Sequence, residues 1–320
     1  MKNIHFSASL LIVIAAVLWA LDGIIRRSLY TLAPVIIVFY EHLIGAIILL
    51  PFLIKGFSKE RVTKREIFII SIVSLLSGLL GTLWFTTALV EVHFISFSVV
   101  FLLQKLQPIF AISAGAIFLK EKVDRRYIKW AALAIVAAYF VTFNNGYVNL
   151  QTGQGTIIAA LYALGAAFAW GSSTAFSRMV LLKNSHVVTT GLRFVITTIF
   201  AFFAVFLFGQ GTKFASPDFS QFLRFVIIAL STGMVALLIY YKGLAKTEVK
   251  VSTILELTFP ILAIFIDAFM YKTILSPTQY LAAAILMFAM FRIAKLQQAK
   301  KPQKSVAKEK VTPAVVPSQD

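Results

Sequence analysis

Lys105 is the residue of this sequence whose type and setting point most clearly to chemistry. It lies near the middle of a long apolar stretch, with Gln104 and Gln107 beside it and Pro108 one turn further along. A charge deep inside an apolar segment is costly, so it is normally kept where it faces a cavity or a partner of opposite charge. We expect Lys105 to receive an anionic group of a bound molecule, such as a carboxylate, with the two glutamines as further binding residues.

Glu256 offers Lys105 a different role. It lies within the apolar stretch 249–272, where the internal repeat described below places it opposite Gln104. A structural ion pair between Lys105 and Glu256 is therefore a second prediction of equal standing. The two roles are compatible, because a resting pair that opens can admit a ligand.

Pro108 and Pro260 interrupt apolar stretches that are otherwise suited to helices. A proline inside a helix removes one backbone hydrogen bond and frees carbonyl groups one turn earlier. We expect both prolines to break or kink their helices beside a cavity, and a kink that only shapes packing is the alternative.

Glu41 and His42 are adjacent titratable residues in the apolar stretch 33–54. Carboxyl groups and imidazoles inside membranes are the usual relay groups for protons. Glu41, His42 and Glu256 are therefore candidate proton carriers, and a hydrogen-bonded helix contact is the alternative for His42.

Four other charged residues are expected to be structural or remain without a role. Arg193 occupies the position that matches Glu41 in the second half, and its side chain is expected to reach toward a membrane surface. Asp22 precedes Arg26 by four residues, which predicts a local helix pair near the outer surface. Asp267 has no partner evident in the sequence.

Four aromatic residues are candidate walls of a binding cavity. Trp19 and Trp170 occupy matching positions in the two halves, and Trp84 and Tyr240 lie in a second pair of matching segments. Their rings can stack on an apolar or cationic ligand. Packing between helices is the alternative for each.

The amino-acid composition indicates whether these residues lie in water or in a membrane. Of the 320 residues, 59% are hydrophobic and 13% are charged, whereas soluble domains are about 45–50% apolar and about 25% charged. The net charge of +17 comes from short basic clusters between apolar runs, which is typical of membrane topology signals and not of nucleic-acid binding. The absence of cysteine excludes disulfides and thiolate metal sites. These features predict an all-α integral membrane protein.

A bilayer core of about 30 Å needs roughly 20 apolar residues per helix. Ten segments meet this requirement, and they lie at 8–26, 33–54, 66–90, 94–119, 127–145, 155–182, 187–208, 222–245, 249–272 and 277–296. The runs are too long for barrel strands and lack their alternation, so helices are predicted.

The sequence contains an internal repeat. AAVLWA at 15–20 matches AAFAWG at 166–171, and PIFAISAGAIFLK at 108–120 aligns without a gap with PILAIFIDAFMYK at 260–272. Five spans per repeat is an odd number, so the two halves must lie inverted across the bilayer. Inverted repeats are typical of secondary transporters, whose binding site lies near the midplane where the repeats meet.

These motifs, in their order and duplication, resemble the EamA-type members of the drug/metabolite transporter superfamily. The resemblance covers about residues 8–296 and is strongest at LQPIFA (106–111) and FLKEK (118–122). It implies a ten-helix fold and the export or exchange of small metabolites, amino acids or drug-like compounds through a central cavity. Glu41 stands where the family usually has arginine, and Thr273 where it usually has glutamate, which leaves the substrate class open.

The sequence therefore predicts a secondary transporter that works by alternating access, and its partners are a small-molecule substrate, the lipid bilayer and either a proton or a counter-substrate. An antiporter of phosphorylated or carboxylate metabolites that uses Lys105 is the alternative. A membrane-embedded enzyme is disfavoured because the charges are scattered. No P-loop, HExxH metal motif or glycine-rich nucleotide motif is present, so no cofactor and no metal are expected.

The chain is expected to divide into a first repeat at 8–145, a second at 155–296 and a basic, disordered cytoplasmic tail at 297–320. With the N-terminus in the cytoplasm, 23 lysines and arginines of the loops, tails and span ends face inward and five face outward. This bias predicts a cytoplasmic-membrane protein with both termini in the cytoplasm.

Reporter fusions test this topology. A cytoplasmic reporter at either terminus should be active, because positively charged loops are retained on the cytoplasmic side. A reporter that works only outside the cytoplasm should be silent at both ends. Activity of such a reporter at the C-terminus would contradict the predicted span number and orientation together.

Overall fold

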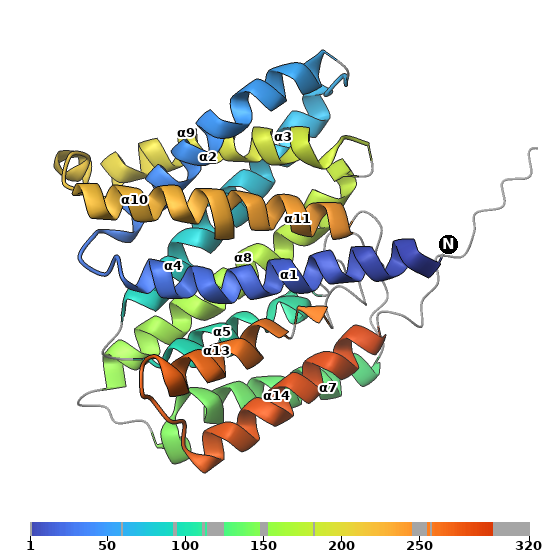
Figure 1. The fold of residues 1–320 in the computed structure, drawn as a ribbon. Coiled ribbons are helices and arrows are strands. Elements are labelled where there is room, and N and C mark those ends of the chain that lie inside the picture. Colours follow the sequence, from blue (N-terminus) through green and yellow to red (C-terminus); the bar gives the residue numbers. More distant parts are fainter. Residues whose placement is uncertain are drawn as a thin grey trace, which may run out of the picture.

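The computed structural model describes residues 2–58, 60–91, 95–110, 113, 125–147, 153–181, 183–244, 255–256 and 258–296. Within these residues every regular element is helical. Figure 1 shows long helices that lie side by side and run in similar directions across the view. The all-α fold class predicted from the apolar segments is confirmed. The predicted tail, 297–320, lies outside the described residues.

The helices of the first half fall within or overlap the first five predicted spans. They are α1 (Lys2–Arg27), α2 (Pro34–Phe57), α3 (Lys64–Val73), η1 (Ser74–Gly81), α4 (Thr82–Val90), α5 (Phe97–Gln104), α7 (Arg125–Thr142) and the short η2 (Asn144–Gly146).

The helices of the second half follow the same order. They are α8 (Gly153–Leu181), α9 (His186–Leu207), the short η3 (Gly211–Lys213), α10 (Phe219–Ile227), η4 (Ile228–Thr232), α11 (Met234–Leu244), α13 (Thr258–Phe269) and α14 (Pro277–Leu296).

Hydropathy and length agree with the membrane prediction. Within the described residues, six helical stretches are long and apolar enough to cross a bilayer, namely Ala8–Arg27, Pro34–Phe57, Lys64–Val90, Gly155–Leu181, His186–Leu207 and Phe219–Gly243. Shorter apolar helices occupy Phe97–Phe110, Thr258–Phe269 and Pro277–Ile293. With α7 these stretches provide a helix in each of the ten predicted spans. Large apolar side chains such as Phe203 and Leu207 are exposed on the outside, as a lipid-facing surface requires.

Some helix ends carry strong local signals. Thr63 and Glu66 form a reciprocal capping box at the start of α3, and Asp218 and Gln221 form another at the start of α10. The Ser185 side chain accepts from the Val188 N–H at the start of α9. Each box satisfies backbone donors that the first turn of a helix leaves unpaired.

The two halves pack through matching helix pairs. α2 packs on α9, α5 on α13 and α7 on α14, so the second, fourth and fifth spans contact their own repeat mates. α1 packs on α11, and α4 packs on α8. The first span of each half therefore contacts the third span of the other half. This reciprocal pattern is the one that a two-fold axis in the membrane plane produces.

Spans three and eight both contain a π-helical stretch at matching places. η1 ends at Gly81, and η4 ends one residue before Gly233, which is the repeat mate of Gly81. A π-helical turn inserts a residue into the helix and is often found at functional sites. Ser77 in η1 and Thr232 in η4 both line the cavity described next.

Candidate functional site

A cavity of about 170 Å³ lies between the two repeats. Its walls include side chains from α1, α2, η1 and α4 of the first half and from α8, α9, α11 and η4 of the second. The residues around it combine aromatic rings, hydroxyl groups and charged groups of both signs. A polar cavity at the repeat interface is the location predicted for a binding site.

Lys105 and Glu256 form an ion pair on one wall of this cavity. The Lys105 ammonium lies 3.3 Å from Glu256 Oε2, and the Tyr240 hydroxyl donates to Glu256 Oε1 over 2.8 Å. The Lys105 side chain is 7% exposed and its ammonium lies 4.4 Å from the centre of the Phe259 ring. The predicted pair is therefore confirmed, and both members also line the cavity.

The helix that carries Lys105 is interrupted at this residue. α5 ends at Gln104, Lys105 and Leu106 form a turn, and a helical segment resumes at Gln107. Pro108 lies in the first turn of that segment, where its missing N–H does no harm. This break comes directly before Pro108. Pro260 likewise lies in the first turn of α13, and Glu256 forms a turn shortly before that helix, so the two prolines have matching places. The kink predicted at each proline stays a prediction.

The two glutamines differ in their surroundings. Gln104 is 5% exposed, and its Oε1 atom accepts no hydrogen bond from the described residues. Gln107 is half-buried, and its carbonyl oxygen lies so close to α8 that a Cβ at Gly171 would be 2.5 Å from it. Both glutamines line the cavity. The small size of Gly171 therefore lets α8 approach the break.

Three of the four predicted aromatic residues line the cavity. The rings of Trp19 and Tyr240 are 5.0 Å apart, and the Trp170 Nε1 donates to the Ser77 carbonyl over 2.9 Å. The prediction for Trp84 is wrong, since this residue is not among the cavity residues and packs on α8 at Gly165. On α4 the cavity side is occupied by Phe85 instead.

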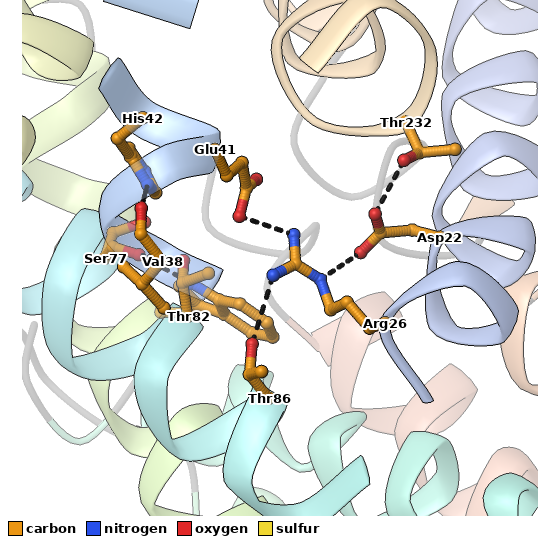
Figure 2. Close-up of polar contacts among 10 residues, drawn as sticks. Asp22, Arg26, Val38, Glu41, His42, Ser77, Thr82, Thr86 and Thr232 are labelled. Carbon is orange, nitrogen blue, oxygen red and sulfur yellow. Dashed lines mark hydrogen bonds and ion pairs between the residues drawn. The ribbon is translucent and has the colours of Figure 1, made fainter. Parts of the chain in front are cut away.

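Arg26 is the centre of a buried network that joins both halves. Its Nε atom lies 2.5 Å from Asp22 Oδ2, its Nη2 atom 2.7 Å from Glu41 Oε2, and its Nη1 atom donates to Thr86. The Thr232 hydroxyl donates to Asp22 Oδ1 over 2.6 Å. Figure 2 shows the guanidinium between the two carboxylates, with α1, α2, α4 and η4 each contributing a side chain.

This network confirms and extends the expectation for Asp22 and Arg26. The predicted pair four residues apart exists, and it is buried inside the protein, because Arg26 is only 3% exposed. Glu41 completes it from α2. The carboxyl groups of Asp22 and Glu41 share the one guanidinium of Arg26, so the network has one more acidic group than basic groups.

His42 lies beside this network and makes the helix contact named above as its alternative. Its Nδ1 atom is 2.9 Å from the Val38 carbonyl one turn earlier, and its ring packs 4.9 Å from the Phe194 ring. His42 also lines the cavity. The proton-carrier role of Glu41, His42 and Glu256 stays a prediction.

Arg193 is buried and lines the cavity. It is 8% exposed, its Nη1 atom donates to the Tyr241 hydroxyl over 3.0 Å, and its Nη2 atom donates to Ser77 Oγ over 2.7 Å. The expectation that its side chain reaches a membrane surface is therefore wrong. Both hydroxyl partners hold the guanidinium at the cavity wall.

Asp267 holds the start of a helix in the other half. Its Oδ2 atom accepts from the backbone N–H of Ser98, in the first turn of α5, over 2.6 Å. Ser96 occupies the cap position of α5, but its side chain makes no capping bond. A buried helix start needs acceptors for its free N–H groups, and a carboxylate is favoured there. Asp267 therefore caps α5 from α13.

Replacing Asp267 with alanine should destabilise the protein by about 1–2 kcal/mol, which is the usual effect of losing a helix cap. The measurement is the melting temperature of the purified protein in detergent. Ser96→Ala is the matched control, because the Ser96 side chain makes no capping bond. Equal melting temperatures for the two variants would contradict the capping role.

Sequence reasoning did not place Asp22, Arg26 or Arg193 at the cavity. The available signal was the one used for Lys105, a charge inside an apolar span. Within the described residues, no group of three or more His, Cys, Asp or Glu is arranged to hold a metal ion.

The chain matches the model of the EamA-like transporter family twice, at residues 6–143 and 157–294. The chain belongs to the EamA-like transporter family. A curated relative, "Riboflavin transporter ImpX" of Fusobacterium nucleatum subsp. nucleatum, is 37% identical over 295 residues, which is 91% of this chain and 99% of the relative. A protein of known crystal structure has a TM-score of 0.63 at 17% identity, over 92% of this chain and 99% of that one, so it supports the fold.

These matches confirm three predictions. The chain is an EamA-type protein built from two repeats, it is a multi-pass membrane protein, and it is a small-molecule transporter and not an enzyme. The cavity between the repeats of an EamA-like transporter is thus the candidate substrate site.

Proposed function

We propose that this EamA-like transporter carries riboflavin across the cytoplasmic membrane by alternating access. The observation that carries this proposal is the 37% identity to a riboflavin transporter, which extends over nearly the whole of both chains. The charge bias of the loops supports a cytoplasmic location for both termini. From the sequence we expect the protein to be an exporter or an exchanger.

The chemistry of the cavity supports a flavin substrate. Riboflavin has a flat, three-ring heterocycle and a flexible chain of hydroxyl groups. Trp19, Tyr240 and Phe259 offer aromatic faces on one wall, and Trp170 and Phe85 offer aromatic faces elsewhere in the cavity. Aromatic rings favour stacked or edge contacts with such heterocycles.

Polar groups at the cavity support recognition of the hydroxyl chain. Lys105, Gln104, Gln107 and Glu256 lie at the α5 break and on the facing wall, and together they provide donors and acceptors. The Gln104 Oε1 atom accepts no bond from the described residues, which leaves it available to a ligand hydroxyl. A few such groups beside the aromatic rings are enough to orient a ligand.

Transport is expected to require no ATP. Driving force comes either from a proton gradient or from exchange with a second substrate molecule, and Glu41, His42 and Glu256 are the proposed proton carriers. Each lies at the cavity wall, and intramembrane carboxyl groups and imidazoles are the usual relay groups.

Proteoliposomes that contain the purified protein test the proposal. Proteoliposomes loaded with radiolabelled or fluorescent riboflavin should release it faster than loaded vesicles that contain no protein. An imposed pH gradient or external riboflavin should raise the rate of release. Flux equal to that of protein-free vesicles would exclude riboflavin as the substrate. Flux that ignores both driving forces would replace coupled transport with facilitated diffusion.

Exchange of anionic metabolites is the second candidate. It is favoured by the three cations at the cavity, Lys105, Arg26 and Arg193. The same vesicles distinguish it, since phosphorylated or carboxylate compounds outside should then accelerate efflux of such compounds inside, while riboflavin should have no effect.

A further inference from the structure

Arg193 differs from the other two cations of the cavity in its partners. Arg26 pairs with Asp22 and Glu41, and Lys105 pairs with Glu256. Among the described residues, no carboxylate lies within ion-pair distance of Arg193, whose two hydrogen-bond partners are neutral hydroxyl groups.

One edge of the Arg193 guanidinium is also left without an acceptor. Its Nε atom is buried and makes no hydrogen bond with the described residues. An unpaired buried donor is costly, and more so when it belongs to a charged group. Arg193 lines the cavity, so a ligand that binds there and packs against this residue is the candidate source of the missing acceptor.

The neighbours of Arg193 fix the direction of this free edge. Tyr241 in α11 and Ser77 in η1 hold the two terminal nitrogens, from opposite halves of the chain. Ser77 is fixed in turn, because its carbonyl accepts from Trp170 Nε1. A guanidinium held in this way presents its Nε–H in a fixed direction. Nη2 beside it carries two N–H groups and uses one of them for Ser77, so the other can be the second, parallel donor.

The charge of the cavity favours a neutral acceptor. Its acidic residues are Asp22, Glu41 and Glu256, and its basic residues are Arg26, Lys105 and Arg193. The three charges of each sign balance, although Arg193 is separate from the paired groups. A phosphate would bring an uncompensated double negative charge into this low-dielectric space, whereas a polarised carbonyl would not.

We propose that the Nε edge of Arg193 binds the N1 and C2-carbonyl acceptor pair of the flavin heterocycle. This assignment rests on riboflavin as the substrate. The two acceptors lie side by side on the pyrimidine ring, so they match two parallel donors. Arg193 then favours a flavin over flat aromatic molecules that lack such a pair.

Substrate analogues test the contact without changing the protein. The affinities of riboflavin, 1-deazariboflavin and 5-deazariboflavin are measured by displacement of radiolabelled riboflavin from the wild-type protein. 1-Deazariboflavin replaces the N1 acceptor with C–H, and 5-deazariboflavin makes the same change on the far side of the ring. We expect the first to bind about tenfold more weakly than riboflavin, because it loses a hydrogen bond to a charged group, and the second to bind as riboflavin does.

Variants of Arg193 provide the second arm. Arg193→Gln and Arg193→Lys should weaken riboflavin binding by about tenfold or more, and they should bind 1-deazariboflavin and riboflavin equally. Lys183→Gln is the control, since the Lys183 side chain is 70% exposed and lies away from the cavity. A purely structural role for Arg193 would lower the melting temperature but would leave the preference for riboflavin over 1-deazariboflavin intact.

The outcomes separate this inference from the proposed function. If the wild-type protein does not bind riboflavin, both are overturned. If it binds riboflavin and both analogues equally, the Arg193 contact is overturned while riboflavin transport stands. Tighter binding of riboflavin 5′-phosphate that depends on Arg193 would overturn the neutral acceptor and assign the guanidinium to phosphate. Should the variants not fold, the analogue series on the wild-type protein decides alone.

Discussion

Replacing Arg26 with methionine should destabilise the protein more than any other single change at the cavity. The substitution leaves the carboxylates of Asp22 and Glu41 facing each other in a buried setting without their shared cation. Removing one member of a buried ionic group typically costs about 3–5 kcal/mol. Here two charges lose their partner, so we expect a low melting temperature and little protein in the membrane.

A triple variant separates lost charge from lost packing. Arg26→Met combined with Asp22→Asn and Glu41→Gln removes all three charges and keeps similar shapes, so the melting temperature should recover most of the loss. Lys183→Met is the control, because this lysine pairs with Glu66 at an exposed position where ion pairs contribute little. A stable Arg26→Met protein would contradict the network seen in Figure 2.

Lys105→Met should have the second largest effect. It keeps the length of the side chain but leaves the carboxylate of Glu256 with the Tyr240 hydroxyl in place of its ion-pair partner. The expected loss of stability is about 3–5 kcal/mol. The melting temperature measures this loss, and uptake into proteoliposomes measures its effect on transport.

The double variant Lys105→Met with Glu256→Gln distinguishes stability from substrate contact. It should restore the melting temperature, because no unpaired charge remains. Transport should stay at least tenfold below the wild-type rate, since both residues line the cavity and their hydrogen bonds to the ligand are lost. A double variant with the wild-type transport rate would limit the pair to a structural role.

The sequence was sufficient for the membrane fold. Apolar runs of the right length located the helices, because a bilayer of fixed thickness imposes both helix length and internal hydrogen bonding. The repeat then predicted the contact between Lys105 and Glu256, since it places Glu256 opposite Gln104, the neighbour of Lys105, in the matching fourth and ninth spans. Depth in the membrane and repeat position together carried that prediction.

Most contacts between residues on different spans could not be predicted from the sequence. Nothing in the spacing of Arg26 and Glu41 indicates that α1 and α2 bring them together, and the partner of Asp267 lies 169 residues away at Ser98. Trp84 failed for a related reason, because membership of a matching span does not say which face of the helix carries a residue. One residue along the helix, Phe85 faces the cavity instead.

Glu41 and Arg193 show how far the two halves of this protein have diverged. They occupy the same place in α2 and α9, and both line the cavity, but they carry opposite charges. An antiparallel pair of identical half-length chains would place two glutamates or two arginines at these sites. Two halves whose sequences change independently can have one of each. The joining of both halves in one polypeptide therefore allows an asymmetric molecule to be held in a nearly symmetric frame.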